Sequence, residues 1–116
     1  MRKFGELLLE EGHATKDQVE RALTYQTLGE SLLGRILTDM KFISLDDKLR
    51  ILAYQQLHRT KKFGECAVEL SLITESQFQK AFEFQRKPKG AIGELMVELG
   101  FITHDQRERV LQRQQA

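Results

Sequence analysis

Several features that would point directly to a class of protein are missing or rare in this chain. Its single cysteine, Cys66, cannot form an internal disulfide, and a lone thiol on the apolar side of its segment suits a reducing compartment. The 18 basic and 17 acidic side chains nearly cancel, so no global field attracts nucleic acid or acidic lipid. No apolar run approaches the roughly 18 residues that cross a bilayer, and the acids of the opening RKFGELLLEEG do not suit a signal peptide. We therefore expect a soluble, cytoplasmic protein without membrane insertion.

Catalytic and metal-binding patterns are absent from the sequence as well. No G-x-x-x-x-G-K-[ST] loop is present to hold nucleotide phosphates, and no nucleophile with a nearby base can be recognised. The histidines, His13, His58 and His104, share neither a repeat position nor a metal-ligand spacing. The sequence therefore predicts a protein that is not an enzyme and that holds no metal or permanent cofactor.

The chain does contain one pattern that occurs four times. Segments 4–26, 33–55, 63–85 and 92–114 each begin with an apolar residue and a glycine and end with a glutamine. The glycines are Gly5, Gly34, Gly64 and Gly93, and the glutamines, always 21 residues later, are Gln26, Gln55, Gln85 and Gln114. A repeat of about 30 residues indicates copies of one supersecondary unit, which share a core that none could build alone.

Each copy is predicted to be a short helix followed by a longer one. Apolar residues flank the glycine and recur nine, fourteen, seventeen and eighteen residues after it, and the last three of these positions share one face of a helix. In the first copy they are Phe4, Leu7, Leu8, Ala14, Val19, Ala22 and Leu23.

Residues at the junction of the two helices support this division. A Ser or Thr precedes each long helix, with Gln or Asp three residues later, which is the pattern of a capping box worth about 1 kcal/mol. The pairs are Thr15 with Gln18, Ser44 with Asp47, Thr74 with Gln77, and Thr103 with Gln106. Gly12 and Gly100 can adopt the left-handed conformation that ends the short helix, whereas Lys41 and Ser71 must do so less comfortably.

The copies are also related in pairs. The first and third glycines are separated by 59 residues, as are the second and fourth, and the first and third copies both open with basic residues and Phe-Gly-Glu. The residue fourteen places after the glycine shows the same pairing, because it is apolar in the odd copies but is Lys48 or Arg107 in the even ones. We therefore predict an all-α fold in which four tandem helix-hairpin repeats form one pseudo-two-fold helical bundle. It would be a single domain, 1–116, made of duplicated halves 1–58 and 59–116.

The repeat also carries a family resemblance. Most copies combine an apolar residue and glycine with isoleucine at position nine, leucine at eighteen and glutamine at twenty-one. This pattern resembles the N-terminal domain of bacterial type II secretion and type IV pilus assembly ATPases, and in particular the MshEN domain, a cyclic di-GMP receptor. The resemblance extends over nearly the whole chain through its four copies, and it is to the accessory module alone, without the ATPase.

The resemblance implies a ligand and the residues that would bind it. The family motif places an arginine two residues before the glycine, where it can hold a phosphate or stack on a guanine. The odd copies keep a cation at that place, Lys3 and Lys62, with Arg2 and Lys61 beside them. The candidate cyclic di-GMP site therefore consists of Arg2, Lys3, Phe4, Gly5, Gln26, Lys62, Phe63, Gly64 and Gln85.

Several candidate residues also have a simpler structural interpretation, which the sequence leaves open. The glycines could let a nucleotide approach the backbone, or could let a short helix start tightly against its neighbour. The glutamines could read a base edge or bind the backbone of the next loop. Lys48 and Arg107 are secondary candidates for an anion site, or cations whose stems pack while their heads reach water.

Two functions are compatible with these features. In the first, cyclic di-GMP lies along the odd copies with Phe4 and Phe63 against its bases, and binding tightens the bundle and is relayed to a protein partner in secretion, pilus motility or related signalling. The alternative is a purely protein–protein interaction or adaptor domain, which docks through an exposed apolar face without a nucleotide. DNA or RNA is not expected as a partner, because phosphates would repel the acids in the first turns of the long helices. These acids are Asp17, Asp46, Asp47, Glu75 and Asp105.

Overall fold

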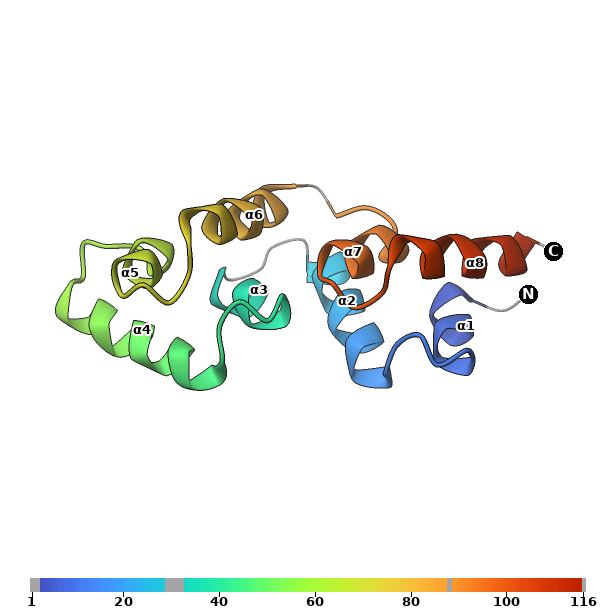
Figure 1. Cartoon of the computed structure of the whole chain (residues 1–116), viewed down its shortest axis with the longest axis horizontal. Coiled ribbons are helices and arrows are strands. Elements are labelled where there is room, and N and C mark those ends of the chain that lie inside the picture. The colour runs from blue at the N-terminus through green and yellow to red at the C-terminus, as the bar shows by residue number, and fades with distance from the viewer. Residues whose placement is uncertain (1–2, 29–32, 88, 116) are drawn as a thin grey trace. The chain divides into compact units, whose positions relative to one another are not determined.

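The computed structural model describes residues 3–28, 33–87 and 89–115, which form eight α-helices and no strand (Figure 1). Short helices of seven residues alternate with long ones of 12 or 13 residues. They are α1 (Phe4–Glu10), α2 (Lys16–Leu28), α3 (Leu33–Asp39), α4 (Leu45–Leu57), α5 (Phe63–Glu69), α6 (Glu75–Arg86), α7 (Ile92–Glu98) and α8 (His104–Gln115). The predicted all-α class is confirmed. Among the described residues, no helix is both long and apolar enough to cross a membrane.

The start of each long helix is set by its capping box. In every copy the hydroxyl accepts a hydrogen bond from the backbone N–H three residues later at 3.1 Å. The side chain at that later position accepts from the backbone N–H of the cap at 2.8 to 3.0 Å. The box at Ser44 closes as fully as the others, although it uses the shorter Asp47.

The end of each short helix is set by one residue in the left-handed conformation. Its φ angle is 73° at Gly12, 64° at Lys41, 59° at Ser71 and 82° at Gly100. The next residue then donates its N–H back into the helix, as Phe42 does to the carbonyl of Leu37 at 2.9 Å. This conformation disfavours side chains by about 1–2 kcal/mol, so the second and third copies carry a strain that the glycines avoid.

The chain divides into two compact units. Unit 1 comprises residues 1–29 and 88–116, with α1, α2, α7 and α8, and unit 2 comprises residues 30–87, with α3 to α6. Within each unit, a short helix packs against the long helix of the other copy: α1 with α8, α2 with α7, α3 with α6, and α4 with α5. A seven-residue helix is too short to be stable alone, so it needs this cover over its apolar face.

These units differ from the predicted halves 1–58 and 59–116. The first copy packs with the fourth and the second with the third, so each unit takes one copy from each half. The 59-residue offset reports which copies are similar in sequence. Which copies pack together depends instead on which apolar faces cover one another, and sequence similarity between two copies does not determine this.

The core of each unit contains residues at the predicted repeat positions. In unit 1 it is formed by Phe4, Leu7, Leu8, Val19, Ala22, Met96, Ile102 and Val110. The seventeenth residue after the glycine is fully buried in all four copies. The prediction was wrong for Leu23, which is 43% exposed, whereas Tyr25 is only 1% exposed. The buried face of α2 is centred on Ala22, so the residue three positions later turns inward and the adjacent Leu23 turns outward.

Candidate functional site

Two repeat glycines lie where the short helices of a unit approach each other. A Cβ atom at Gly34 would lie 3.0 Å from Cζ of Phe63, and one at Gly93 would lie 3.0 Å from Cζ of Phe4. In both cases the aromatic residue before one glycine packs on the glycine of the partner copy. Close packing of a neighbouring helix therefore explains why Gly34 and Gly93 are glycines, without a nucleotide at either position.

Two of the closing glutamines bind the backbone of the partner copy through their side chains. Gln26 donates from Nε2 to the carbonyl of Gly90 at 2.9 Å, and Gln55 donates from Nε2 to the carbonyl of Lys61 at 3.1 Å. Each acceptor lies three residues before the glycine of the partner copy. These glutamines therefore tie the end of a long helix to the start of the short helix that it covers.

The candidate residues of the first copy are mostly used in packing. Arg2 lies outside the described residues, and Lys3 is exposed at the N-cap of α1. Phe4 is only 8% exposed, and a Cβ atom on Gly5 would lie 3.2 Å from Cγ1 of Val19. Gln26 is bonded to the backbone of Gly90, so the aromatic ring and the carboxamide of the first copy are both used in packing.

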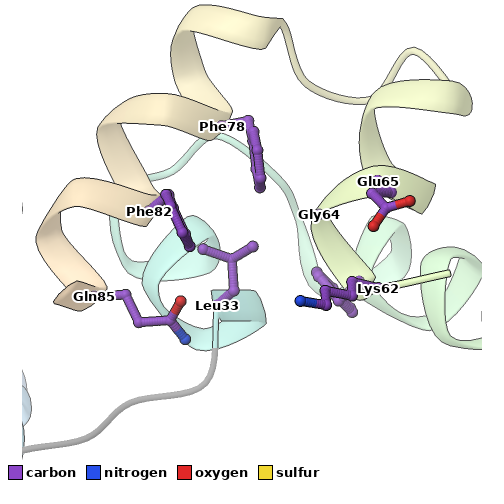
Figure 2. Close-up of a pocket in the computed structure, with 8 residues that line it drawn as sticks. Leu33, Lys62, Gly64, Glu65, Phe78, Phe82 and Gln85 are labelled. Carbon is purple, nitrogen blue, oxygen red and sulfur yellow. The ribbon is translucent and has the colours of Figure 1, made fainter.

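The candidate residues of the third copy, by contrast, line a pocket in unit 2 (Figure 2). Its lining residues are Leu33, Lys62, Phe63, Gly64, Glu65, Phe78, Phe82 and Gln85, and its volume is about 270 Å³. The structure thus brings together all four residues that the third copy was predicted to contribute. They come from α5, α6 and the N-cap of α5, and α3 adds one wall.

The pocket has apolar walls and polar groups at two ends. The rings of Phe78 and Phe82 are stacked, with centroids 5.8 Å apart and planes at 18°. Figure 2 shows the Lys62 ammonium group directed toward Leu33, with the Gln85 carboxamide beyond it. Aromatic faces with a cation and a carboxamide complement a nucleotide, which offers a flat base, a polar base edge and a phosphate.

The sequence did not identify the aromatic walls as site residues. Phe78 and Phe82 stand at positions fourteen and eighteen, which the repeat pattern assigns to the core. Phe78 lies over Gly64, and because that residue has no side chain the ring meets the backbone and leaves space beside it. Arg86 was missed as well, and its guanidinium lies 5.4 Å from the centroid of Phe82. A paired aromatic at the two positions, found only in the third copy, was the available signal.

The size and charge of the pocket limit what it can hold. Its volume of about 270 Å³ is below the roughly 300–1,000 Å³ of sites that enclose a whole drug-sized ligand. It suits one nucleobase rather than a complete dinucleotide. Glu65 lies on the same side of the pocket as Lys62, across from Gln85 (Figure 2), so its carboxylate partly offsets the positive charge of Lys62.

Lys61, the neighbour that could have replaced Lys62 as a phosphate ligand, is committed elsewhere. Its Nζ donates to Oε1 of Glu69, and the hydroxyl of Tyr54 donates to Oε2 of the same carboxylate at 2.8 Å. The hydrogen bond from Lys61, and to a smaller extent that from Tyr54, lowers the pKa of Glu69. In turn, the hydrogen bond that each donates to Glu69 raises the pKa of Lys61 and that of Tyr54. Burial raises the pKa of the Cys66 thiol, so that thiol is an unreactive part of the core.

The secondary anion-site candidates have contacts that match stem packing. Cε of Lys48 lies 3.4 Å from the position of a Cβ atom on Gly34. Arg107 is 20% exposed, and its Nη1 and Nη2 lie 2.8 Å and 3.8 Å from carboxylate oxygens of Glu108 and Glu94. The charge of Arg107 is therefore balanced by carboxylates. Among the described residues, no group of three or more His, Cys, Asp and Glu side chains could hold a metal ion.

Comparison of the chain with protein-family models, curated proteins and solved structures finds no match. The site must therefore be interpreted from its own geometry.

Proposed function

We propose that this protein is a non-enzymatic regulatory module that binds cyclic di-GMP in the pocket of unit 2. The observation that carries the proposal is the convergence of three positions of the resembled motif with a pair of stacked phenyl rings. Gly64 and Gln85 match that motif, and Lys62 keeps a cation where the motif has arginine. The pocket supplies a different group for each part of a guanine nucleotide. We further propose that the four helix pairs are tandem copies of one helix-hairpin unit, as their shared caps and turns suggest.

One guanine base would occupy the pocket. It would stack on Phe82, and such stacking contributes about 1–3 kcal/mol per base. The Gln85 carboxamide can accept from N1–H or N2–H of guanine or donate to its O6, and the Lys62 ammonium can neutralise a phosphate. The second guanine would lie outside the pocket, because the volume accommodates only one base. Arg86, whose guanidinium lies 5.4 Å from the centroid of Phe82, would be the cation for the second phosphate.

The pocket joins two copies, which suggests how binding would be relayed. Leu33 belongs to α3 of the second copy, whereas Lys62 and Gln85 belong to the third. A ligand that touches both would stabilise unit 2 by about 2.7 kcal/mol at a hundredfold excess over its dissociation constant. This would also hold α4, which packs against α5. The outcome would be read by a protein partner of a cytoplasmic secretion, pilus or signalling system.

A second candidate function, an adaptor domain without a nucleotide ligand, is favoured by one separate observation. Helix α4 exposes leucine side chains on one side, Leu45, Leu49 and Leu52, which are 69%, 64% and 40% exposed. Apolar residues grouped on one surface often mark a site of protein contact. The two candidates differ in whether the pocket of unit 2 binds a nucleotide.

Isothermal titration of the whole chain with cyclic di-GMP tests the proposal. We expect saturable binding that weakens about tenfold or more in Lys62→Ala, because a hydrogen bond to a charged group contributes about 1.5–3 kcal/mol. Phe82→Leu, which keeps the wall apolar but removes stacking, should weaken binding by a similar factor. Lys3→Ala, at the same repeat position in the first copy, is the matched control and should bind like the wild type.

Two results would contradict the proposal. An absence of heat with excess ligand would remove the nucleotide and leave the adaptor function. Equal losses in Lys3→Ala and Lys62→Ala would show that the ligand needs both odd copies, so that the single pocket would not be the site.

A further inference from the structure

A second cavity of unit 2, the α4 cavity, lies between α4 and the turn that ends α5. It has a volume of about 370 Å³ and is lined by Arg50, Ala53, Tyr54, Leu57, Leu70 and Leu72. The first four residues follow one another at helical spacing and share one face of α4. The last two flank Ser71, whose left-handed backbone turns the chain at the end of α5. None of these residues lines the nucleotide pocket.

Three of the lining residues occupy repeat positions that can be compared with the other copies. Arg50 and Tyr54 stand sixteen and twenty residues after the glycine of the second copy, and Leu72 stands eight residues after the glycine of the third. Each long helix packs on the short helix of its partner copy, so the same three positions can be followed in the other pairs.

In two of the other pairs, a phenylalanine stands at the eighth position. In unit 2, the ammonium group of Lys80 lies 5.8 Å from the centroid of the Phe42 ring, and Phe84 is only 2% exposed. In unit 1, Phe101 packs against the core, and Tyr25 is only 1% exposed. In both pairs the aromatic residue at the twentieth position is therefore buried.

The remaining pair uses charge instead of an aromatic ring. Arg113 stands at the twentieth position of α8, and it donates to the carboxylates of Glu10 and Glu11 at 2.8 and 2.9 Å. His13 stands at the eighth position of the first copy. All three other pairs thus provide side chains of their own for this place.

The α4 cavity is the place where the phenylalanine is missing. Leu72 is shorter, and Tyr54 stays half-buried. The ring of Tyr54 is nevertheless held, because it stacks on His58 with centroids 4.2 Å apart and its hydroxyl donates to Glu69. Among the residues that the structure describes, the guanidinium of Arg50 forms no ion pair or hydrogen bond. The cavity therefore combines apolar walls, a fixed aromatic ring and an unpaired cation.

We infer that the α4 cavity binds a small aromatic carboxylate. The ring of the ligand would lie against Tyr54 and Leu72, where the other pairs have their phenylalanine. Its carboxylate would face Arg50, because the planar fork of a guanidinium matches that anion. The volume of about 370 Å³ lies within the roughly 300–1,000 Å³ of sites that enclose a small organic ligand.

The surroundings of the cavity agree with an anion that carries its own apolar ring. Glu69 accepts hydrogen bonds from both Tyr54 and Lys61, so the negative charge nearest to the tyrosine is already matched. Apolar walls would leave the hydroxyl groups of a sugar without partners, whereas an aromatic ring needs none.

A ¹H–¹⁵N NMR titration of the whole chain with phenylacetate tests the inference. This probe has about ten non-hydrogen atoms, so we expect a dissociation constant of about 1 mM. Saturable shifts should appear at the backbone amides of Tyr54 and Leu72, with little change at Lys62 and Gly64 of the nucleotide pocket. Phenylacetamide, which has the same ring without the charge, should bind at least several-fold more weakly.

Three variants separate the ring from the charge. Leu72→Phe supplies the missing ring and should weaken binding at least tenfold with an unchanged circular dichroism spectrum, because two other copies fold with phenylalanine there. Arg50→Gln should remove the preference for phenylacetate over phenylacetamide. Lys80→Gln, at the same repeat position in the third copy, is the matched control and should bind like the wild type.

The inference would be overturned by a wild type that shows no saturable shifts at Tyr54 and Leu72. Unchanged binding in Leu72→Phe, or equal losses in Arg50→Gln and Lys80→Gln, would overturn it as well. Equal affinity of the wild type for phenylacetate and phenylacetamide would reject the carboxylate as the ligand class. None of these results depends on whether the other pocket binds a nucleotide, since the two sites share no lining residue.

Discussion

Replacing Gly64 with alanine tests whether packing requires glycine at the pocket. The added methyl group would lie 2.2 and 2.7 Å from Cε1 and Cδ1 of Phe78, and 2.9 Å from Cδ2 of Leu33. The ring of Phe78 is stacked on Phe82, which restricts the directions in which it can move. Overpacking of this kind costs about 1–3 kcal/mol.

The change also has a favourable term. Gly64 is the second residue of α5, and alanine favours a helix over glycine by up to about 1 kcal/mol. We therefore expect a net loss of roughly 1–2 kcal/mol in the free energy of unfolding. Gly5→Ala is the matched control, because its methyl group would meet only Cγ1 of Val19, at 3.2 Å. That contact relaxes with a shift of a few tenths of an ångström, so we expect a change within about 0.5 kcal/mol.

Urea unfolding followed by far-ultraviolet circular dichroism measures both variants. The wild type and the two variants should share the same dependence on urea, so the midpoints report the stability differences. If Gly64→Ala proved as stable as Gly5→Ala, or more stable, the phenyl ring would not be held over the glycine and the shape assigned to the pocket would be incorrect.

Two further predictions concern the second and third copies. Lys41→Gly should raise the free energy of unfolding by about 1 kcal/mol, whereas Gly12→Ala, whose methyl group would meet no atom within 4 Å, should lower it by a similar amount in the same urea assay. If the left-handed backbone is the cause, the two substitutions must change the free energy of unfolding in opposite directions. The pKa of Glu69 should lie below its ordinary value in an NMR titration, because Lys61 and Tyr54 favour the carboxylate. Its contribution to stability is then complete above the unfolded-state pKa of about 4.3 and is lost as the pH falls through the folded-state value. The stability difference between the wild type and Glu69→Gln should therefore shrink in acid, and a difference that did not change with pH would contradict this.

Local structure was predictable because it depends on residues close together in the sequence. The caps at Ser44 and Thr74 need only a side chain three residues later, and the left-handed positions of Lys41 and Ser71 follow from alignment with two glycines. The alternation of short and long helices follows from the spacing of apolar residues, which is a property of each copy alone.

The pairing of the copies was not predictable in this way, because it depends on surfaces that are distant in the sequence. The 59-residue offset grouped the first copy with the second, whereas packing groups it with the fourth. The same limit applies to single side chains: Leu23 and Tyr25 lie two residues apart, and only the neighbouring helices determine which one is buried.

The candidate site was predicted in part. The resemblance suggested equivalent residues in the first and third copies, and only those of the third line the described pocket. Phe4 and Phe63 pack alike on Gly93 and Gly34, so the difference lies at position fourteen, where the first copy has Val19 and the third has Phe78, whose ring covers Gly64 and lines the pocket. The pattern treats an apolar residue as core in either case, so only the structure distinguishes a filled position from a pocket wall.

The most direct test of the central claim is a ¹H–¹⁵N NMR titration of the whole chain with cyclic di-GMP. The account predicts saturable shifts at the backbone amides of Lys62 and Gly64 and at the side-chain carboxamide of Gln85, with little change at Gly5. Cyclic di-AMP, which presents a different base edge to the carboxamide, should produce smaller shifts at the same concentration. An absence of saturable shifts, or shifts largest in the first copy, would contradict the assignment of the pocket in unit 2 as the nucleotide site.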